Sequence, residues 1–180
     1  MTRHRSIGGI YAYEAAHILR QINKTVEGIF LIDAPCPGTI PPLPHETVDL
    51  LDNLGITGGA KSKVGGNNTR THFLGNIEAL KRYTPRPMMN GEEPTCLALW
   101  ARDGVWESVS DEERRRLKST WGKDNEAQRW IMDARNWDGA NGWEALLPKV
   151  HVEVVPGNHF SLMKRPQVCA FPSFPFLLAI

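Results

Sequence analysis

The chain has 180 residues, 41% of them hydrophobic and 23% charged, with a formal net charge of +1. This balance fits one globular domain with a buried core. A charge near zero argues against a nucleic-acid partner or an electrostatically bound membrane, and no apolar run reaches the ~18 residues that a bilayer span needs. The three cysteines are far apart and form no CxxC pair, so we expect no metal site, no redox motif and a cytoplasmic protein.

The N-terminal part of the chain predicts a helix followed by a strand. Residues 8–22 are mostly apolar with polar side chains at helical spacing, which is typical of a helix packed closely against a sheet. Residues 29–32 (IFLI) are apolar without alternation, as in a parallel strand buried on both faces. Asp33 follows this strand directly, and the prolines after it end the extended run.

Residues 38–94 differ in character, because they are rich in proline and glycine. Short helices are predicted at residues 45–54 and 71–83, separated by a polar stretch at residues 60–70 that we expect to be irregular. An insertion of helix and loop between two core strands suggests a lid over a binding site.

The C-terminal half predicts two more strands with helices between them. Residues 95–100 (TCLALW) and 150–155 (VHVEVV) are the strands. Ser110 and Glu113 have the spacing of a capping box at a helix start, and this helix is predicted to continue, with a break near Gly122, towards Arg135. The alternation of helix and strand predicts an α/β fold with a mostly parallel sheet.

A candidate nucleophile lies at the start of the first helix, in the sequence Ser6–Ile7–Gly8–Gly9. In a nucleophile elbow, small residues allow a sharp turn that exposes the serine, and the amide of the next residue, here Ile7, points at the developing oxyanion. The first glycine of the usual G-x-S-x-G pattern is replaced by His4. The residues alone therefore leave a second interpretation open, a serine that only caps the helix.

Two further residues complete a possible triad, Asp33 after the first strand and His159 in the turn after the last one. Their order with Ser6 is Ser, Asp, His, as in α/β-hydrolases. A serine needs a histidine to take its proton and a carboxylate to orient that histidine. Asp103 follows the second strand and is an alternative acid, since nothing in its local sequence separates it from Asp33.

Six blocks of the chain resemble the C-terminal thioesterase (thioesterase/Claisen cyclase) domain of fungal non-reducing polyketide synthases, in the α/β-hydrolase superfamily. The blocks are SIGGIYAYEAA, FLIDAPCP followed by PLP, HFLGNIEALKRY, LALWARDGVWE, MDARNWDGANGWEALLP and VEVVPGNHFSLM. The resemblance implies Ser6, Asp33 and His159 as the triad. It also implies a lid over a hydrophobic chamber and release of a polyketide from an acyl-carrier-protein thioester, by hydrolysis, lactone formation or Claisen-type cyclisation.

The same resemblance sets the expected organisation of the chain. We expect a single, N-terminally truncated thioesterase domain over residues 1–180. Its parts are the elbow, helix and acid strand (6–37), the lid (38–94), the C-terminal core with the histidine (95–163) and an atypical tail (164–180). No cofactor is expected, because the phosphopantetheine arm of a carrier protein delivers the substrate, and other synthase domains are expected partners. Two alternatives stay open: an impaired fragment without the N-terminal core and oxyanion loop, and a generic α/β-hydrolase esterase that uses Asp103.

Overall fold

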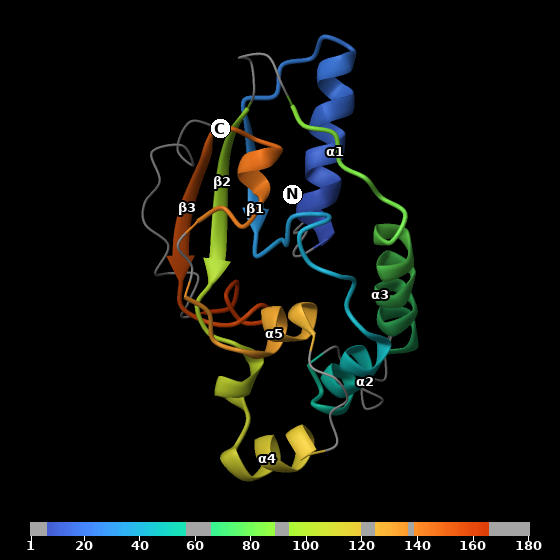
Figure 1. The fold of residues 1–180 in the computed structure, drawn as a ribbon, viewed down its shortest axis with the longest axis vertical. Helices are drawn as coiled ribbons and strands as arrows, with labels where there is room; N and C mark the ends of the chain where they lie inside the picture. The colour runs from blue at the N-terminus through green and yellow to red at the C-terminus, as the bar shows by residue number, and fades with distance from the viewer. Residues whose placement is uncertain (1–6, 57–65, 89–93, 120–124, 137–138, 166–180) are drawn as a thin grey trace.

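The structure, a computed structural model, describes residues 7–56, 66–88, 94–119, 125–136 and 139–165. Its centre is a parallel sheet in the order β1-β2-β3, formed by β1 (Gly28–Ile32), β2 (Thr95–Ala101) and β3 (Val150–Val155). The three strands run in the same direction in Figure 1, so their carboxyl ends share one edge. The predicted α/β fold with a parallel sheet is confirmed.

Helix α1 (Ile7–Gln21) packs on β1, within one residue of its predicted bounds. Gly9 makes this contact close, since a Cβ atom there would lie 2.5 Å from the Ala34 Cβ and 3.2 Å from the Leu31 side chain. Figure 1 shows that the first turn of α1 lies at the same end of the sheet as the strand tips. The beginning of α1 is therefore held beside the residues that follow β1.

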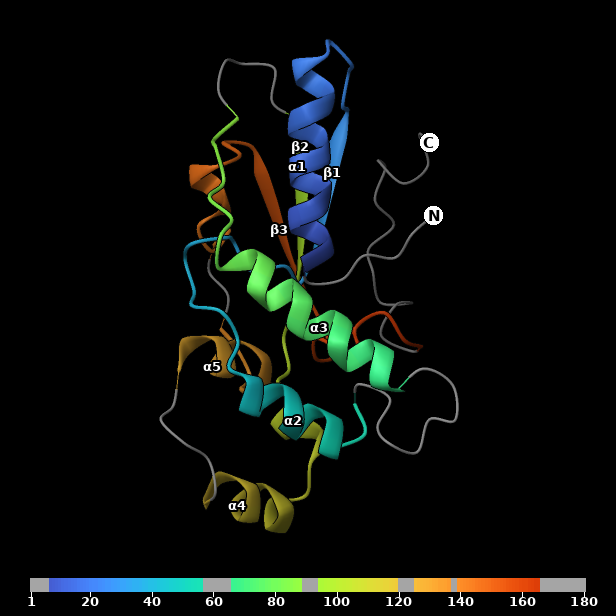
Figure 2. The same ribbon diagram turned by 90° about the vertical axis from the view of Figure 1, so that its right-hand side faces the viewer.

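The predicted insertion contains α2 (His45–Asn53) and α3 (Gly66–Leu80), which lie side by side in Figure 2. Helix α3 begins five residues before the predicted position, so residues 66–70 are helical and the prediction of an irregular stretch is wrong for them. A helix that begins with Gly, Asn and Asn has weak intrinsic propensity in its first turn, so the sequence pattern gave no sign of it.

The segment after β2 forms separate short helices: η1 (Val105–Ser108), α4 (Asp111–Ser119) and α5 (Glu126–Met132). The Glu113 amide donates to the Ser110 hydroxyl at 3.3 Å, as the capping prediction requires. The prediction of a helix running on towards Arg135 is wrong at its end, because α5 ends at Met132 and Asn125 caps its start through a bond with the Gln128 amide. The predicted break near Gly122 falls outside the described residues.

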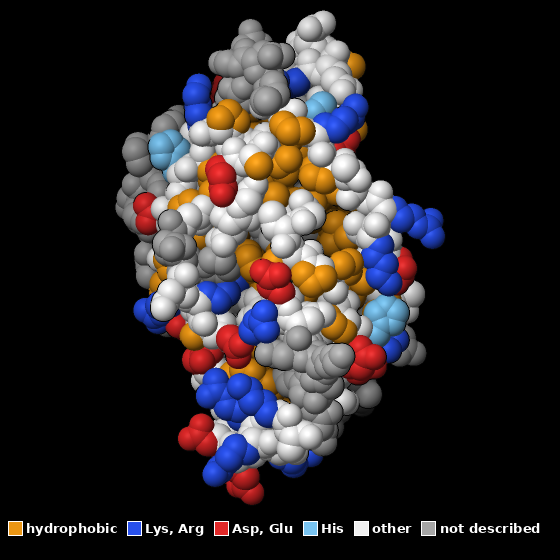
Figure 3. Space-filling model, viewed as in Figure 1, with side chains coloured by type: hydrophobic (Ala, Val, Ile, Leu, Met, Phe, Trp, Pro, Cys, Tyr) orange, Lys and Arg blue, Asp and Glu red, His pale blue; other side chains and the backbone are white. Residues whose placement is uncertain are grey.

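The core lies between the sheet and its covering segments, and three tryptophans fill much of it. Trp100, Trp106 and Trp143 are almost fully buried, and η2 (Trp143–Ala145) places the last of these edge-on against Tyr13 of α1. The Trp143 indole donates to the Ala34 carbonyl at 2.8 Å, which fixes the chain just after β1. Figure 3 shows hydrophobic side chains across the middle of one face and charged ones crowded at the end where α4 lies.

Candidate active site

Asp33 is the first residue beyond β1 and points its carboxylate along the carboxyl edge of the sheet. Its backbone is left-handed, with φ of 47°, a conformation that Asp and Asn adopt more readily than most residues. Its amide continues the ladder by donating to the Leu99 carbonyl at 2.8 Å, and its Oδ1 accepts the Ala101 amide at 3.0 Å. The fully buried carboxylate is thus oriented by β2 as well as by its own strand.

The Asp33 carboxylate meets the His159 ring, although 126 residues separate them in the chain. His159 Nδ1 lies 2.7 Å from Asp33 Oδ2, and the histidine is 3% exposed. A carboxylate can only accept, so Nδ1 carries the proton of this hydrogen bond and Nε2 is the nitrogen left to take another one. The structure therefore brings two of the three predicted triad residues together in the arrangement of an acid that orients a base.

A tight turn after β3 presents His159. Gly157 has φ of 96°, which favours glycine, and the Asn158 side-chain oxygen accepts the amides of Phe160 and Ser161, both at 3.0 Å. The Ser161 hydroxyl in turn accepts the Asn158 amide at 2.9 Å. This closed set of bonds fixes the backbone that carries the imidazole, and the predicted turn after the last strand is confirmed.

Arg135 also binds Asp33 and was not predicted. Its Nη2 lies 3.0 Å from both carboxylate oxygens, and its side chain is 8% exposed. The guanidinium stacks over the ring of Trp130, with its carbon 4.9 Å from the ring centroid. Arg135 sits 102 residues from Asp33, after the end of α5, so no local pattern in the sequence could reveal the pair.

The surroundings of Asp33 favour its ionised form. Burial would raise the pKa of Asp33, but the contacts with His159, the charge of Arg135 and the Ala101 amide together outweigh burial and hold the pKa below its ordinary value. The acid is therefore a carboxylate throughout the neutral range, as an orienting acid must be.

Asp103, the alternative acid, is engaged elsewhere. Its Oδ2 accepts the Gly157 amide at 2.8 Å, and its Oδ1 pairs with the Arg102 guanidinium at 2.8 Å on the surface. Its pKa is lowered mainly by the bond with Arg102. Asp103 thus supports the backbone of the turn that carries His159, while the His159 ring bonds Asp33.

Ser6 lies outside the described residues, and Ile7 is the first residue of α1. Because Gly9 packs against Ala34, the start of α1 is close to the residue that follows Asp33. The first amides of any helix lack an acceptor within the helix, and those of α1 belong to Ile7 and its neighbours. The described structure thus holds Ile7, the residue after Ser6 in the sequence, at the end of α1 that lies close to the acid.

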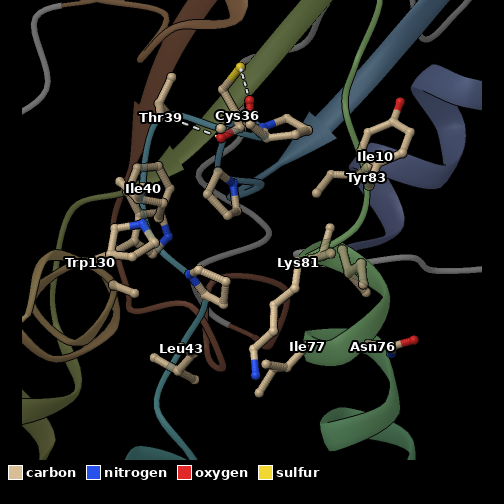
Figure 4. A pocket seen from close by; sticks show the side chains of 18 of the residues that line it. Ile10, Cys36, Thr39, Ile40, Leu43, Asn76, Ile77, Lys81, Tyr83 and Trp130 are labelled. Atoms are coloured by element: carbon tan, nitrogen blue, oxygen red, sulfur yellow. Dashed lines mark hydrogen bonds between the residues drawn. The ribbon is translucent and has the colours of Figure 1, made fainter.

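A cavity of about 860 Å³ opens beside the start of α1. Figure 4 shows its walls, which come from α1, the proline-rich loop after β1, α3 and α5. Ile7, Ile10, Ile77 and Trp130 are among the apolar lining residues, and the volume lies in the range of small-molecule sites. Since α3 belongs to residues 38–94, the predicted lid segment contributes to the wall, and its action as a lid stays a prediction.

The cavity wall also includes the Cys36 thiol, whose Sγ bonds the Pro37 carbonyl at 3.7 Å. Burial raises the pKa of Cys36, and likewise that of Cys96 in β2, to about 12. Both are free, buried thiols. Within the described ranges, no three His, Cys, Asp or Glu side chains are grouped to hold a metal ion, and no described helix has the length and apolar character to cross a membrane.

The chain is similar to parts of known synthases. The family model of the thioesterase domain matches residues 6–173. The chain is 39% identical over 173 residues to the non-reducing polyketide synthase PKS16 of Cladonia grayi, and 35% identical over 172 residues to the non-reducing polyketide synthase terA of Aspergillus terreus. These matches cover 91% and 93% of this chain, and the chain spans about 8% of either synthase.

Solved structures share the fold. A four-domain nonribosomal peptide synthetase matches 89% of this chain and 13% of its own, with a TM-score of 0.56 and 18% identity. The NocB thioesterase domain, solved as a covalent complex with a fluorophosphonate nocardicin G analog, matches 89% of this chain and 56% of its own, with a TM-score of 0.53 and 22% identity. The resemblance inferred from the sequence is confirmed, and this chain belongs to the thioesterase domain family, enzymes of the α/β-hydrolase fold.

Proposed function

We propose that the chain is a serine-triad thioesterase in which Ser6 is the nucleophile, His159 the base and Asp33 the orienting acid. The observation that carries this proposal is the 2.7 Å hydrogen bond between His159 and the buried Asp33 carboxylate, at the sheet edge where α1 begins. A base held by an ionised acid next to the start of the nucleophile helix is the constellation that acyl transfer needs.

The proposed chemistry has two steps. His159 Nε2 takes the proton of the Ser6 hydroxyl while the serine oxygen attacks the thioester carbonyl, and the amide of Ile7 donates to the resulting oxyanion. The carbon–sulfur bond then breaks, and the thiolate leaves with the proton from His159. A water molecule, or a hydroxyl or carbon nucleophile within the acyl chain, next attacks the acyl-serine ester, and His159 removes its proton and returns one to Ser6.

The substrate we propose is a polyketide bound as a thioester to the phosphopantetheine arm of an acyl carrier protein. Two observations support it: the relatives are named as polyketide synthases, and an apolar cavity large enough for an aromatic acyl group lies beside the start of α1. Product release follows either hydrolysis or closure of a lactone or carbon ring. The other domains of a synthase are the expected partners.

A fluorophosphonate probe tests the nucleophile directly. We expect labelling of the wild-type chain at Ser6, located by peptide mass spectrometry, and a loss of at least about 10³-fold in labelling rate with Ser6→Ala or His159→Gln. Ser119→Ala is the matched control, because this serine lies at the exposed end of α4, where it bonds the Arg116 carbonyl, and the variant should label at the wild-type rate.

An acyl-thioester surrogate then tests turnover in the same variants. Labelling at a residue other than Ser6, or a labelling rate that His159→Gln leaves unchanged, would contradict the proposed triad. A chain that unfolds cooperatively on heating but neither labels nor turns over would instead support the alternative of a catalytically impaired thioesterase.

A further inference from the structure

Arg135 shares the proposed acid with His159. Both side chains reach the same atom, since Asp33 Oδ2 lies 2.7 Å from His159 Nδ1 and 3.0 Å from Arg135 Nη2. Arg135 bonds Oδ1 as well, at 3.0 Å, and the Ala101 amide supplies the remaining donor. A serine triad needs only the histidine at its acid, so a second, permanent charge on the carboxylate calls for an explanation.

The position of Arg135 is fixed by contacts with three elements. Its amide donates to the Arg102 carbonyl after β2 at 3.0 Å, its guanidinium stacks on Trp130 of α5, and its Nη2 binds the acid after β1. Burial lowers the pKa of Arg135 and the Asp33 carboxylate opposes this effect, and an arginine is charged across the neutral range. The charge therefore stays at the acid whether His159 is neutral or protonated.

The charged groups around the proposed base come from several elements. Among the described residues, Asp33 after β1 bonds the imidazole and Arg135 after α5 bonds the same carboxylate, and the Phe160 ring packs edge-on against the imidazole. Asp103, after β2, bonds the Gly157 amide two residues before His159 and is itself paired with Arg102. Arg135 is thus the cation that offsets the negative charge next to the imidazole.

We propose that Arg135 is a positioning residue that offsets the charge of Asp33 and so keeps His159 neutral, and able to accept the serine proton, at lower pH than the acid alone would allow. This inference rests on the proposed function for its catalytic meaning. With Arg135 present, protonation of His159 gives the three side chains a net positive charge; without it, protonation neutralises an isolated carboxylate and becomes more favourable. Burial of the whole group strengthens this effect, because water screens it little.

The test measures the protonation of His159 directly. NMR follows the pH midpoint of the His159 imidazole resonances in the wild type and in two variants, Arg135→Met and Arg135→Gln. Both variants remove the positive charge, and the glutamine still offers a hydrogen-bond donor to Asp33. A unit charge about 6 Å away at an effective dielectric constant of about 20 corresponds to a shift of roughly one to two pH units. We expect the midpoint to rise by that amount in both variants.

The same variants are compared in the pH profile of probe labelling. The rising limb should move to higher pH by the same amount, so that labelling near pH 6 falls by about 10- to 100-fold and recovers at alkaline pH. Arg135→Lys restores a charge and should bring the midpoint most of the way back. Arg116→Met is the matched control, because that arginine pairs with Glu113 on the exposed helix α4 and should leave both readouts unchanged.

An unchanged or lowered midpoint in Arg135→Gln overturns the proposal, even if the protein is less stable or slower at every pH, since this would indicate a structural role alone. Should Arg135→Met fail to fold, the Gln variant decides the question. The NMR readout does not depend on catalysis. A midpoint that rises in a protein whose Ser6 never labels would contradict the proposed function and leave the role of Arg135 standing.

Discussion

Replacing each of the two strand-end aspartates by asparagine separates the orienting acid from its neighbour. Asp33→Asn replaces the negative carboxylate, whose Oδ2 lies 2.7 Å from His159 Nδ1, by a neutral amide. An asparagine can hold the imidazole in the wrong tautomer and cannot stabilise its protonated form. Asp103→Asn removes a charge that bonds the Gly157 amide and Arg102.

The two substitutions should differ by orders of magnitude in their effect on the rate of serine acylation. Asp33→Asn should lower the rate of serine acylation by about 10³- to 10⁴-fold. It also leaves the buried Arg135 without its counter-charge, at a cost of about 3–5 kcal/mol in the free energy of unfolding. Asp103→Asn keeps an oxygen for the Gly157 amide and loses an exposed ion pair that contributes less than about 1 kcal/mol, so its rate should fall by less than about fivefold.

The assay is the rate of probe labelling at Ser6, measured with both variants and corrected for the folded fraction determined by denaturant unfolding. The correction is needed because 3–5 kcal/mol is a large part of the about 5–15 kcal/mol that stabilises a typical domain. Equal losses in the two variants, or a larger loss with Asp103→Asn, would refute the assignment of Asp33 and favour the esterase alternative that uses Asp103.

Three further predictions test packing, burial and pH dependence. Gly104→Ala should destabilise the fold by about 1–3 kcal/mol, because its Cβ would lie 2.3 Å from a backbone carbonyl oxygen at the end of α5; Gly75→Ala, with open space around it, is the control in a denaturant melt. In a Cys169→Ser background, Cys36 and Cys96 should react with iodoacetamide at pH 8 only after the protein unfolds. Rapid alkylation of either thiol in the native protein would contradict its burial. Because the pKa of Asp33 is lowered by folding, its contribution to stability is complete above about pH 4 and lost as the pH falls below that value, so Asp33→Asn should flatten the acid limb of a stability profile.

The parts of the fold that local pattern determines were predictable. Apolar runs marked β1 and β2, the valine-rich stretch VHVEVV marked β3, and the structure places His159 in the predicted turn after β3. The order of elements then placed Asp33 and His159 at one sheet edge, since the carboxyl ends of parallel strands meet there. Their contact in the structure follows from topology more than from any property of the two residues.

The parts that depend on long-range packing were not predictable. Arg135 looks like any polar residue after a helix, and its pairing with Asp33 exists only because the chain after α5 crosses the edge of the sheet beside Trp130. Likewise, α3 starts in a Gly-Asn-Asn sequence with weak helix propensity, so its early residues resembled a loop. A single sequence contains no local signal for either feature.

The thiol in the cavity wall bears on the fate of the acyl group. A thiolate beside a bound thioester would exchange with it and draw the acyl chain away from serine. Burial raises the pKa of Cys36 to about 12, so the thiol is protonated at neutral pH. The burial that packs this side chain beneath the proline-rich loop thus also makes it a poor nucleophile, and it limits competition with the proposed acyl transfer to serine.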